Sequence, residues 1–153
     1  MLVEDVELVL DVQVPGAVRC LAKVFDQSTY PFPRDEVGRR WREEIDDPST
    51  DCFVGTIAGE IRGFAATRGP ELLHFGTAVE TWGVGLATWL HDAVCASMVA
   101  SGVRRAHLRV FTDNDRGRRF YEKLGWAPTG ETSRSRFPPY PELLTYERAL
   151  PIR

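Results

Sequence analysis

TWGVGLATWL (residues 81–90) is the stretch that decides the fold of this chain. Two glycines, Gly83 and Gly85, follow the apolar run 72–79 and lead into a segment whose apolar residues have helical spacing. A strand, a glycine turn and a helix in this order bind phosphate. The backbone N–H groups at the start of the helix can approach an anion where no side chain intervenes. The stretch therefore predicts a ligand that carries phosphate.

Two common phosphate sites do not fit this stretch. A dinucleotide fingerprint needs a third glycine, where Thr88 stands, and an acid about 20 residues further on, where the chain reads VRRAH (103–107). A nucleoside-triphosphate loop ends in Gly-Lys-Ser/Thr, and GLAT (85–88) does not supply it. A dinucleotide-dependent oxidoreductase is therefore disfavoured.

The pattern outside this stretch predicts one mixed α/β domain over residues 1–153, with helices on both faces of the sheet. Strands are expected at 6–14, 71–79, 104–112, 126–137 and 142–150, and a hairpin at 52–68. Helices are expected at 17–27, 34–47, 86–100 and 116–125.

Composition narrows the partners and the compartment. The formal net charge of −3 is unfavourable for nucleic acid or a membrane surface, and no apolar run approaches the roughly 20 residues of a membrane span. Acids stand where a signal peptide has basic residues, so a cytoplasmic protein is expected. Three widely spaced cysteines (Cys20, Cys52, Cys95) indicate buried thiols, and the histidines (His74, His91, His107) lack metal-ligand spacing, so no metal is expected.

A second motif lies one predicted strand after the glycines. Asn114 follows that strand, Tyr121 comes seven residues later, and YEKLGW (121–126) ends the next helix. Together with Gly85 and Ala87 at the small positions of a Q/R-x-x-G-x-G/A signature, this order resembles the GNAT superfamily of acyl-CoA-dependent N-acyltransferases, in its bacterial small-molecule type. Trp82 departs from the pattern, because it stands before the first glycine where the family has Gln or Arg.

The resemblance implies the GNAT fold: a mixed, mostly antiparallel sheet of about six to seven strands with a splayed parallel pair that holds acetyl-CoA. It implies that backbone from Val84 to Thr88 cradles the pyrophosphate and that the N–H groups of Thr77 and Val79 hold the acetyl carbonyl. Asn114 would bind the pantetheine arm, cap its helix, or do both, and a nearby arginine would meet phosphate. The implied cofactor residues are Thr77, Ala78, Val79, Trp82, Gly83, Val84, Gly85, Leu86, Ala87, Thr88, Asn114 and Arg118.

Two residues are expected to carry the chemistry. By its match to the family, Tyr121 would donate a proton to the leaving thiolate; a core tyrosine is the alternative. Glu71 is the first residue of the strand expected at 71–79, and alternation puts its side chain on the same face as Phe75 and Thr77. It would act as general base for an amine. A solvated strand-end carboxylate is an equal alternative for Glu71. Alternation puts His74 on the opposite face of this strand from Glu71, so it is expected to be a core or edge histidine. A bulge in the strand would change which side chains face which side.

The acceptor is expected between two segments rich in aromatic residues and proline, 25–33 and 136–144. Tyr30, Phe32, Trp41 and Tyr140 are the candidate wall residues, unless they only pack the sheet. The expected function is direct transfer of an acetyl group from acetyl-CoA to a primary amine of a small molecule in a ternary complex. A non-catalytic acyl-CoA-binding sensor or structural module is the alternative, and a homodimer stays open.

Overall fold

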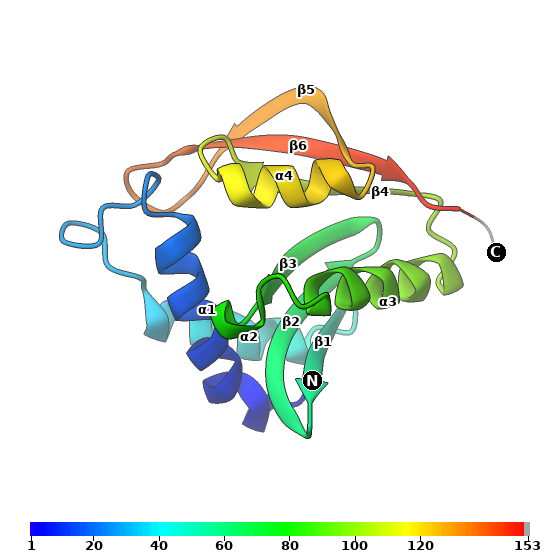
Figure 1. The fold of residues 1–153 in the computed structure, drawn as a ribbon, viewed down its shortest axis with the longest axis horizontal. Helices are drawn as coiled ribbons and strands as arrows, with labels where there is room; N and C mark the ends of the chain where they lie inside the picture. The colour runs from blue at the N-terminus through cyan, green and yellow to red at the C-terminus, as the bar shows by residue number, and fades with distance from the viewer. Residues whose placement is uncertain (152–153) are drawn as a thin grey trace.

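The computed structural model describes residues 1–151, which form a six-stranded mixed sheet in the order β1-β2-β3-β4-β6-β5 (Figure 1). The β3–β4 pair is parallel and the other pairs are antiparallel, which confirms the predicted α/β class. The helices are α1 (Val6–Cys20), α2 (Arg34–Asp46), α3 (Leu86–Ala100) and α4 (Asp115–Lys123), with short 3₁₀ turns η1 (Val3–Asp5) and η2 (Val79–Thr81). The strands are β1 (Thr50–Ile57), β2 (Glu60–Arg68), β3 (Glu71–Thr77), β4 (Arg105–Phe111), β5 (Ala127–Arg134) and β6 (Glu142–Ala149).

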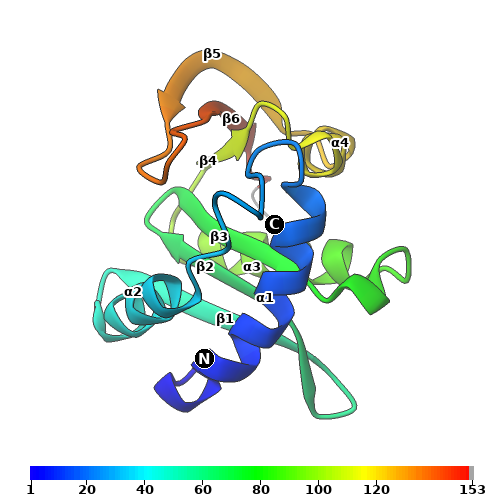
Figure 2. The ribbon, with the colours of Figure 1, turned by 90° about the vertical axis from the view of Figure 1, so that its left-hand side faces the viewer.

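The sheet separates two apolar cores, because helices cover both of its faces (Figures 1 and 2). Alternation along β2 shows this directly: Ala65 faces one core, while Phe64 and Ala66 face the other. α3 packs on the Ala65 face with Leu90, Val94 and Met98, beside Leu108, Trp126 and Tyr146. α1 and α2 pack on the opposite face with Val6, Val9, Leu10 and Trp41.

The N-terminal prediction is wrong, because residues 6–14 are not a strand and residues 17–27 are not one helix. A single helix, α1, spans Val6–Cys20. Its buried residues Val6, Val9 and Leu10 have helical spacing, while Leu8, which an alternating pattern would bury, is 55% exposed. Pro15 lies inside the helix on its exposed side and only removes one N–H from the ladder. Burial against the sheet therefore overrides the β propensity of the valines.

The parallel pair separates after its first two residues. β3 and β4 are in register only at Glu71 with His107 and at Leu72 with Leu108. Beyond that point they diverge and divide the sheet into the halves β1–β3 and β4–β6 (Figure 1). The Ala78 N–H donates to the Arg62 carbonyl at 2.7 Å, so by alternation the N–H groups of Phe75 and Thr77 point away from β2, into the gap.

A bulge in β3 lies next to this separation. His74 pairs with Ala66 and Leu72 pairs with Thr67, so that Leu73 is the extra residue. Such a bulge changes which side chains face which side of the sheet. Glu71 and His74 were expected on opposite faces of the strand, and the bulge puts them on the same face.

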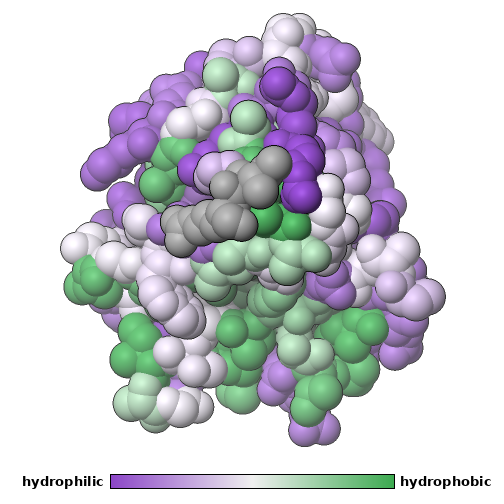
Figure 3. All heavy atoms as spheres, turned by 90° about the vertical axis from the view of Figure 1, so that its right-hand side faces the viewer, coloured by the Kyte–Doolittle hydropathy of each residue, from purple (hydrophilic) through white to green (hydrophobic). Residues whose placement is uncertain are grey.

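Within residues 1–151, no helix has the length and apolarity to cross a bilayer. The longest, α1 and α3, have 15 residues each, fewer than the roughly 20 that a span needs. Figure 3 shows one face of the molecule, with hydrophilic side chains gathered in its upper half and hydrophobic ones below.

Candidate active site

Two cavities meet at the point where β3 and β4 separate. The first, which we call the splay groove, has a volume of about 720 Å³ and lies between β3 and β4, bounded by α1, α4 and the glycine turn. The second, which we call the aromatic cavity, has a volume of about 960 Å³ and lies between α2 and the β5–β6 loop. Both are lined by Gln13, Leu72, Leu73, His74 and Arg109 among others. A molecule in one cavity can therefore reach a molecule in the other.

The glycine turn is built for close approach of an anion. Gly83 and Gly85 have φ of 85° and 91°, and a Cβ added to either would meet no atom within 4 Å. α3 starts at Leu86. The first N–H groups of a helix have no carbonyl partner within it, and no side chain caps those of α3. Ala87 and Thr88 line the splay groove, whereas the side chain of Val84 is exposed and that of Leu86 is buried in the core.

Trp82 gathers positive charge beside this turn. Its indole Nε1 donates to the Thr77 carbonyl at 3.2 Å, and the Arg116 guanidinium carbon lies 3.9 Å from its ring centroid. Arg19 lies on the same ring at 5.6 Å. These are cation–π distances, so the residue that departs from the family signature holds a cation at the groove by stacking instead.

Four basic residues line the groove: Arg109 on β4, and Arg116, Arg119 and Lys123 on α4. Arg118, the arginine expected to meet phosphate, is directed elsewhere. Its guanidinium donates to the Tyr146 hydroxyl at 3.0 Å and to the Thr112 carbonyl at 3.1 Å. It therefore joins α4 to β6.

Thr77, Ala78 and Val79 are the implied cofactor residues at the end of β3, and Thr77 and Val79 were expected to hold the acetyl carbonyl. Of the three, Thr77 lines the splay groove. Ala78 has no free N–H, because it donates to the Arg62 carbonyl. Ala78 and Val79 instead line a separate hollow beside Asp11 and Pro15 of α1. The N–H groups that point into the gap thus belong to Phe75 and Thr77.

Asn114 caps α4 and also lines the splay groove. Its side-chain oxygen accepts from the Gly117 N–H at 2.9 Å. A Cβ on Gly117 would lie 2.5 Å from Asn114 Nδ2, so the cap requires glycine there. The predicted N-cap is confirmed.

Tyr121 lies on α4 in the wall of the splay groove. Its ring packs on Phe75, Phe120 and Trp126, with centroid distances of 6.5, 5.3 and 6.1 Å. Burial raises its pKa well above the usual range, and the negative charge that Cys20 carries once it is deprotonated at high pH adds to the rise. No hydrogen bond contributes to the shift. The phenol therefore keeps its proton at neutral pH, as an ordinary tyrosine also does.

The three cysteines are unreactive thiols. Burial raises the pKa of Cys20 and Cys95, and raises that of Cys52 to about 11. A thiol that holds its proton at neutral pH is a poor nucleophile. Cys20 lines the splay groove without being a candidate for covalent catalysis.

Glu71 lines the aromatic cavity at the one place where β3 and β4 still pair. Its carboxylate lies 3.4 Å from Arg109 on β4, and about a quarter of the side chain is exposed. It is therefore a partly solvated carboxylate with a cationic partner.

Sequence reasoning missed a polar cluster behind the junction of the cavities. His74 Nε2 lies 2.7 Å from Glu44 Oε2, and Arg40 holds the other Glu44 oxygen at 2.9 Å. Burial raises the pKa of Glu44, but the hydrogen bond and charge of His74, with help from Arg40, outweigh it and leave the pKa below its usual value. Trp41 packs on the His74 ring at 4.8 Å and donates to Gln13 at 2.8 Å. The one signal in the sequence was Glu44, an acid that follows Trp41 by three residues and so lies near the apolar side of the predicted helix.

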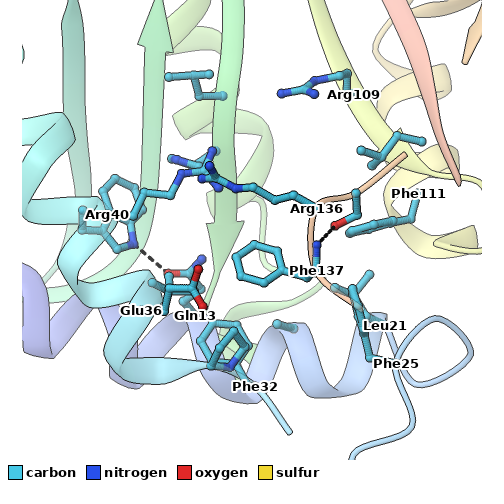
Figure 4. A pocket seen from close by; sticks show the side chains of 18 of the residues that line it. Gln13, Leu21, Phe25, Phe32, Glu36, Arg40, Arg109, Phe111, Arg136 and Phe137 are labelled. Atoms are coloured by element: carbon cyan, nitrogen blue, oxygen red, sulfur yellow. Dashed lines mark hydrogen bonds between the residues drawn. The ribbon is translucent and has the colours of Figure 1, made fainter. Parts of the chain in front are cut away.

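The aromatic cavity brings together residues from both of the segments rich in aromatic residues and proline. Tyr30, Phe32 and Trp41 line it, while Tyr140 is 54% exposed outside it. Phe137 takes the place expected for Tyr140: Figure 4 shows it inside the cavity, between Phe32 and Arg109. Phe25 and Phe111 meet edge to face at 5.5 Å on the same wall. The cavity thus combines apolar walls with charged groups at its inner end.

Comparison with known proteins agrees with this geometry. Part of the chain is similar to 5-NmdU N-acetyltransferase of Pseudomonas phage PaMx11, at 39% identity over 85 residues. The match covers 52% of this chain and 59% of that protein, so the chain spans less than two thirds of the curated relative.

Two solved structures are similar in fold. PaiA N-acetyltransferase of Thermoplasma acidophilum, solved in complex with coenzyme A, has a TM-score of 0.76 at 14% identity, over 97% of this chain and 95% of that one. A GCN5-related N-acetyltransferase of Rhodopseudomonas palustris has a TM-score of 0.75 at 18% identity, over 98% and 92%. The model of the acetyltransferase (GNAT) family matches residues 18–126. The chain belongs to this family of acyltransferases.

Proposed function

We propose that this protein transfers an acetyl group from acetyl-CoA to a primary amine of a small molecule, by direct attack in a ternary complex. One observation carries the proposal: a groove with unpaired strand N–H groups opens into a separate aromatic cavity, and the two meet beside His74. Two substrates held in this way can meet without a covalent enzyme intermediate.

The residues of the splay groove fit acetyl-CoA, which supplies an acetyl group activated as a thioester. The N–H groups of Leu86, Ala87 and Thr88 would bind the pyrophosphate, since both glycines leave open space in front of the helix. Arg116 and Arg119 would neutralise phosphate charge. Asn114, already the cap of α4, would face the pantetheine arm.

The chemistry would take place between β3 and α4. The N–H groups of Phe75 and Thr77 would stabilise the negative oxygen of the tetrahedral intermediate. Tyr121, which holds its proton at neutral pH, would donate it to the leaving sulfur. Glu71 would attract the ammonium group of the acceptor to the inner end of the aromatic cavity, or act as its base.

The acceptor is a small molecule in this proposal because the aromatic cavity is a hollow of about 960 Å³ with walls on several sides. Such a volume suits a ligand of drug-like size. The relative from phage PaMx11 acts on 5-NmdU, which makes 5-NmdU one acceptor to try on this chain.

The test is a screen of primary amines, 5-NmdU and N-terminal peptides included, that detects free thiol released from acetyl-CoA. Calorimetry with acetyl-CoA, and with NADH as the control ligand, accompanies it. Turnover of a small amine supports the proposal, and turnover of peptides alone contradicts the small-molecule acceptor. Binding of acetyl-CoA without turnover of any amine favours a non-catalytic acyl-CoA module, and absence of binding overturns the cofactor assignment.

A further inference from the structure

We propose that His74 is the general base that deprotonates the acceptor amine, and that Glu44 is the residue that positions it. This inference rests on the proposed function. His74 lines both the splay groove and the aromatic cavity, whereas Glu71 lines only the second. A base at the junction stands next to the nitrogen that must attack the thioester, so position favours His74.

The hydrogen bond to Glu44 decides which ring nitrogen is free. Glu44 is ionised and can only accept, so Nε2 of the neutral imidazole carries the hydrogen at 2.7 Å from Oε2. The lone pair of the neutral ring is then on Nδ1. Arg40 fixes the other Glu44 oxygen, and Trp41 packs against the imidazole with the two rings tilted by 58°, so the imidazole has little freedom to turn.

Burial makes this pair unlike a surface contact. The Glu44 side chain is 7% exposed and that of His74 is 18% exposed. A carboxylate held at that depth stabilises the imidazolium that forms when Nδ1 takes a proton. The orienting acid and the base come from different elements, α2 and β3. His74 pairs with Ala66, which faces the core under α1 and α2, so the imidazole lies on the α2 side of the sheet.

The proton balance is simple. The ammonium of the acceptor gives one proton to Nδ1, directly or through one water, and that proton later passes to solvent. The neutral nitrogen forms its bond to the acetyl carbon, and the carbon–sulfur bond breaks with its electron pair on sulfur. The nitrogen loses a second proton, which balances the one that the thiolate takes up through Tyr121.

Other charged groups around the imidazole are mostly paired. Arg40 lies on Glu44, Glu71 on Arg109, and Arg68 on Asp47 at 3.4 Å. The charged residues that line the aromatic cavity together with His74 are Glu36, Arg40, Glu43, Glu44, Asp47, Arg68, Glu71, Arg109, Arg134 and Arg136. Glu44 is the one that contacts the imidazole directly, so Glu44→Gln is the variant that removes the positioning contact.

The experiment compares His74→Gln, Glu44→Gln and the control His107→Gln, a histidine on β4 that lines neither cavity. With an amine that the wild type acetylates, His74→Gln should lower kcat by about 100-fold or more and abolish the inflection of kcat/KM between pH 5 and 8, with the affinity for acetyl-CoA unchanged. Glu44→Gln should move that inflection to lower pH. His107→Gln should change neither quantity.

Retention of the wild-type rate and inflection in His74→Gln would overturn the role of His74 and leave the proposed function standing. Absence of turnover in the wild type would overturn the proposed function instead. ¹⁵N NMR of the wild-type imidazoles decides the geometry without any variant: hydrogen on Nε2 of His74 supports the proposal, and hydrogen on Nδ1 refutes it.

Discussion

Replacement of Tyr121 by phenylalanine distinguishes the role of the hydroxyl as proton donor from the role of the ring in packing. The ring contacts of Tyr121 with Phe75 and Trp126 survive in phenylalanine, and no hydrogen bond of the hydroxyl contributes to its raised pKa. Loss of a hydroxyl without a partner changes the free energy of unfolding by less than about 1 kcal/mol. Loss of the general acid, by contrast, should lower kcat by about 10²–10⁴-fold, which corresponds to about 2.7–5.4 kcal/mol in the barrier.

Tyr146→Phe is the matched control. Its hydroxyl donates to Glu122 at 2.7 Å and accepts from Arg118 at 3.0 Å, and the tyrosine is fully buried. Both partners are charged but partly exposed, so water compensates in part, and a loss of about 1–2 kcal/mol is expected. For a chain of this size this lowers Tm by about 2–8 °C, with little change in kcat.

The assay measures thiol release at saturating acetyl-CoA from pH 6 to pH 10, together with thermal unfolding of both variants. Because the pKa of Tyr121 is raised, the wild type should not lose its acid anywhere below about pH 10. A wild-type kcat in Tyr121→Phe would refute the role of the hydroxyl. Equal losses of rate and stability in both variants would show that packing, not proton donation, explains the tyrosine.

Three further outcomes are expected. Glu71→Gln should raise KM for the amine several-fold and leave KM for acetyl-CoA unchanged; a loss confined to kcat at low pH would make Glu71 the base. Gly85→Ala strains a residue at φ of 91° and should weaken acetyl-CoA binding about tenfold by calorimetry, whereas Gly59→Ala, with similar strain in the β1–β2 turn, should only lower stability. Hydrogen bonds from Ser49 to Asp47 hold the pKa of that carboxyl at about 2, so its stabilising effect is present above pH 4 and is lost as the pH falls toward 2. In Asp47→Asn, the free energy of unfolding measured by urea titration should fall less between pH 4 and pH 2 than in the wild type. An unchanged fall would contradict the stabilising role of the Asp47 carboxylate.

Most of the fold could be predicted from the sequence where a segment has one dominant period. α2 shows this, since Val37, Trp41 and Ile45 recur every four residues, and the helix ends at Asp46, one residue before the predicted end. α1 could not be predicted, because its valines and leucines satisfy both the alternating and the helical pattern, and only contact with the sheet decides between them.

The candidate site divides in the same way. The glycine turn and the Asn114 cap depend on local chemistry and could be located from residue types alone. The contact of His74 with Glu44 joins residues 30 apart in the sequence. The bulge that puts Glu71 on the same face of the sheet as His74 leaves no mark on the sequence. Tyr140 was misplaced for a related reason, since the path of the loop selects Phe137 to face inward.

The separation of β3 from β4 also gives the sheet two interior edges. Unpaired strand edges normally invite another chain to add as a strand, which leads to aggregation. Here α1 and α4 stand over the gap, and Lys23 after α1 is bridged to Asp115 at the start of α4 at 2.9 Å. Both side chains of that bridge are largely exposed, so it opens at little energetic cost. The two helices therefore protect the interior edges of the sheet from strand addition by a second molecule, and an exposed ion pair joins them across the gap.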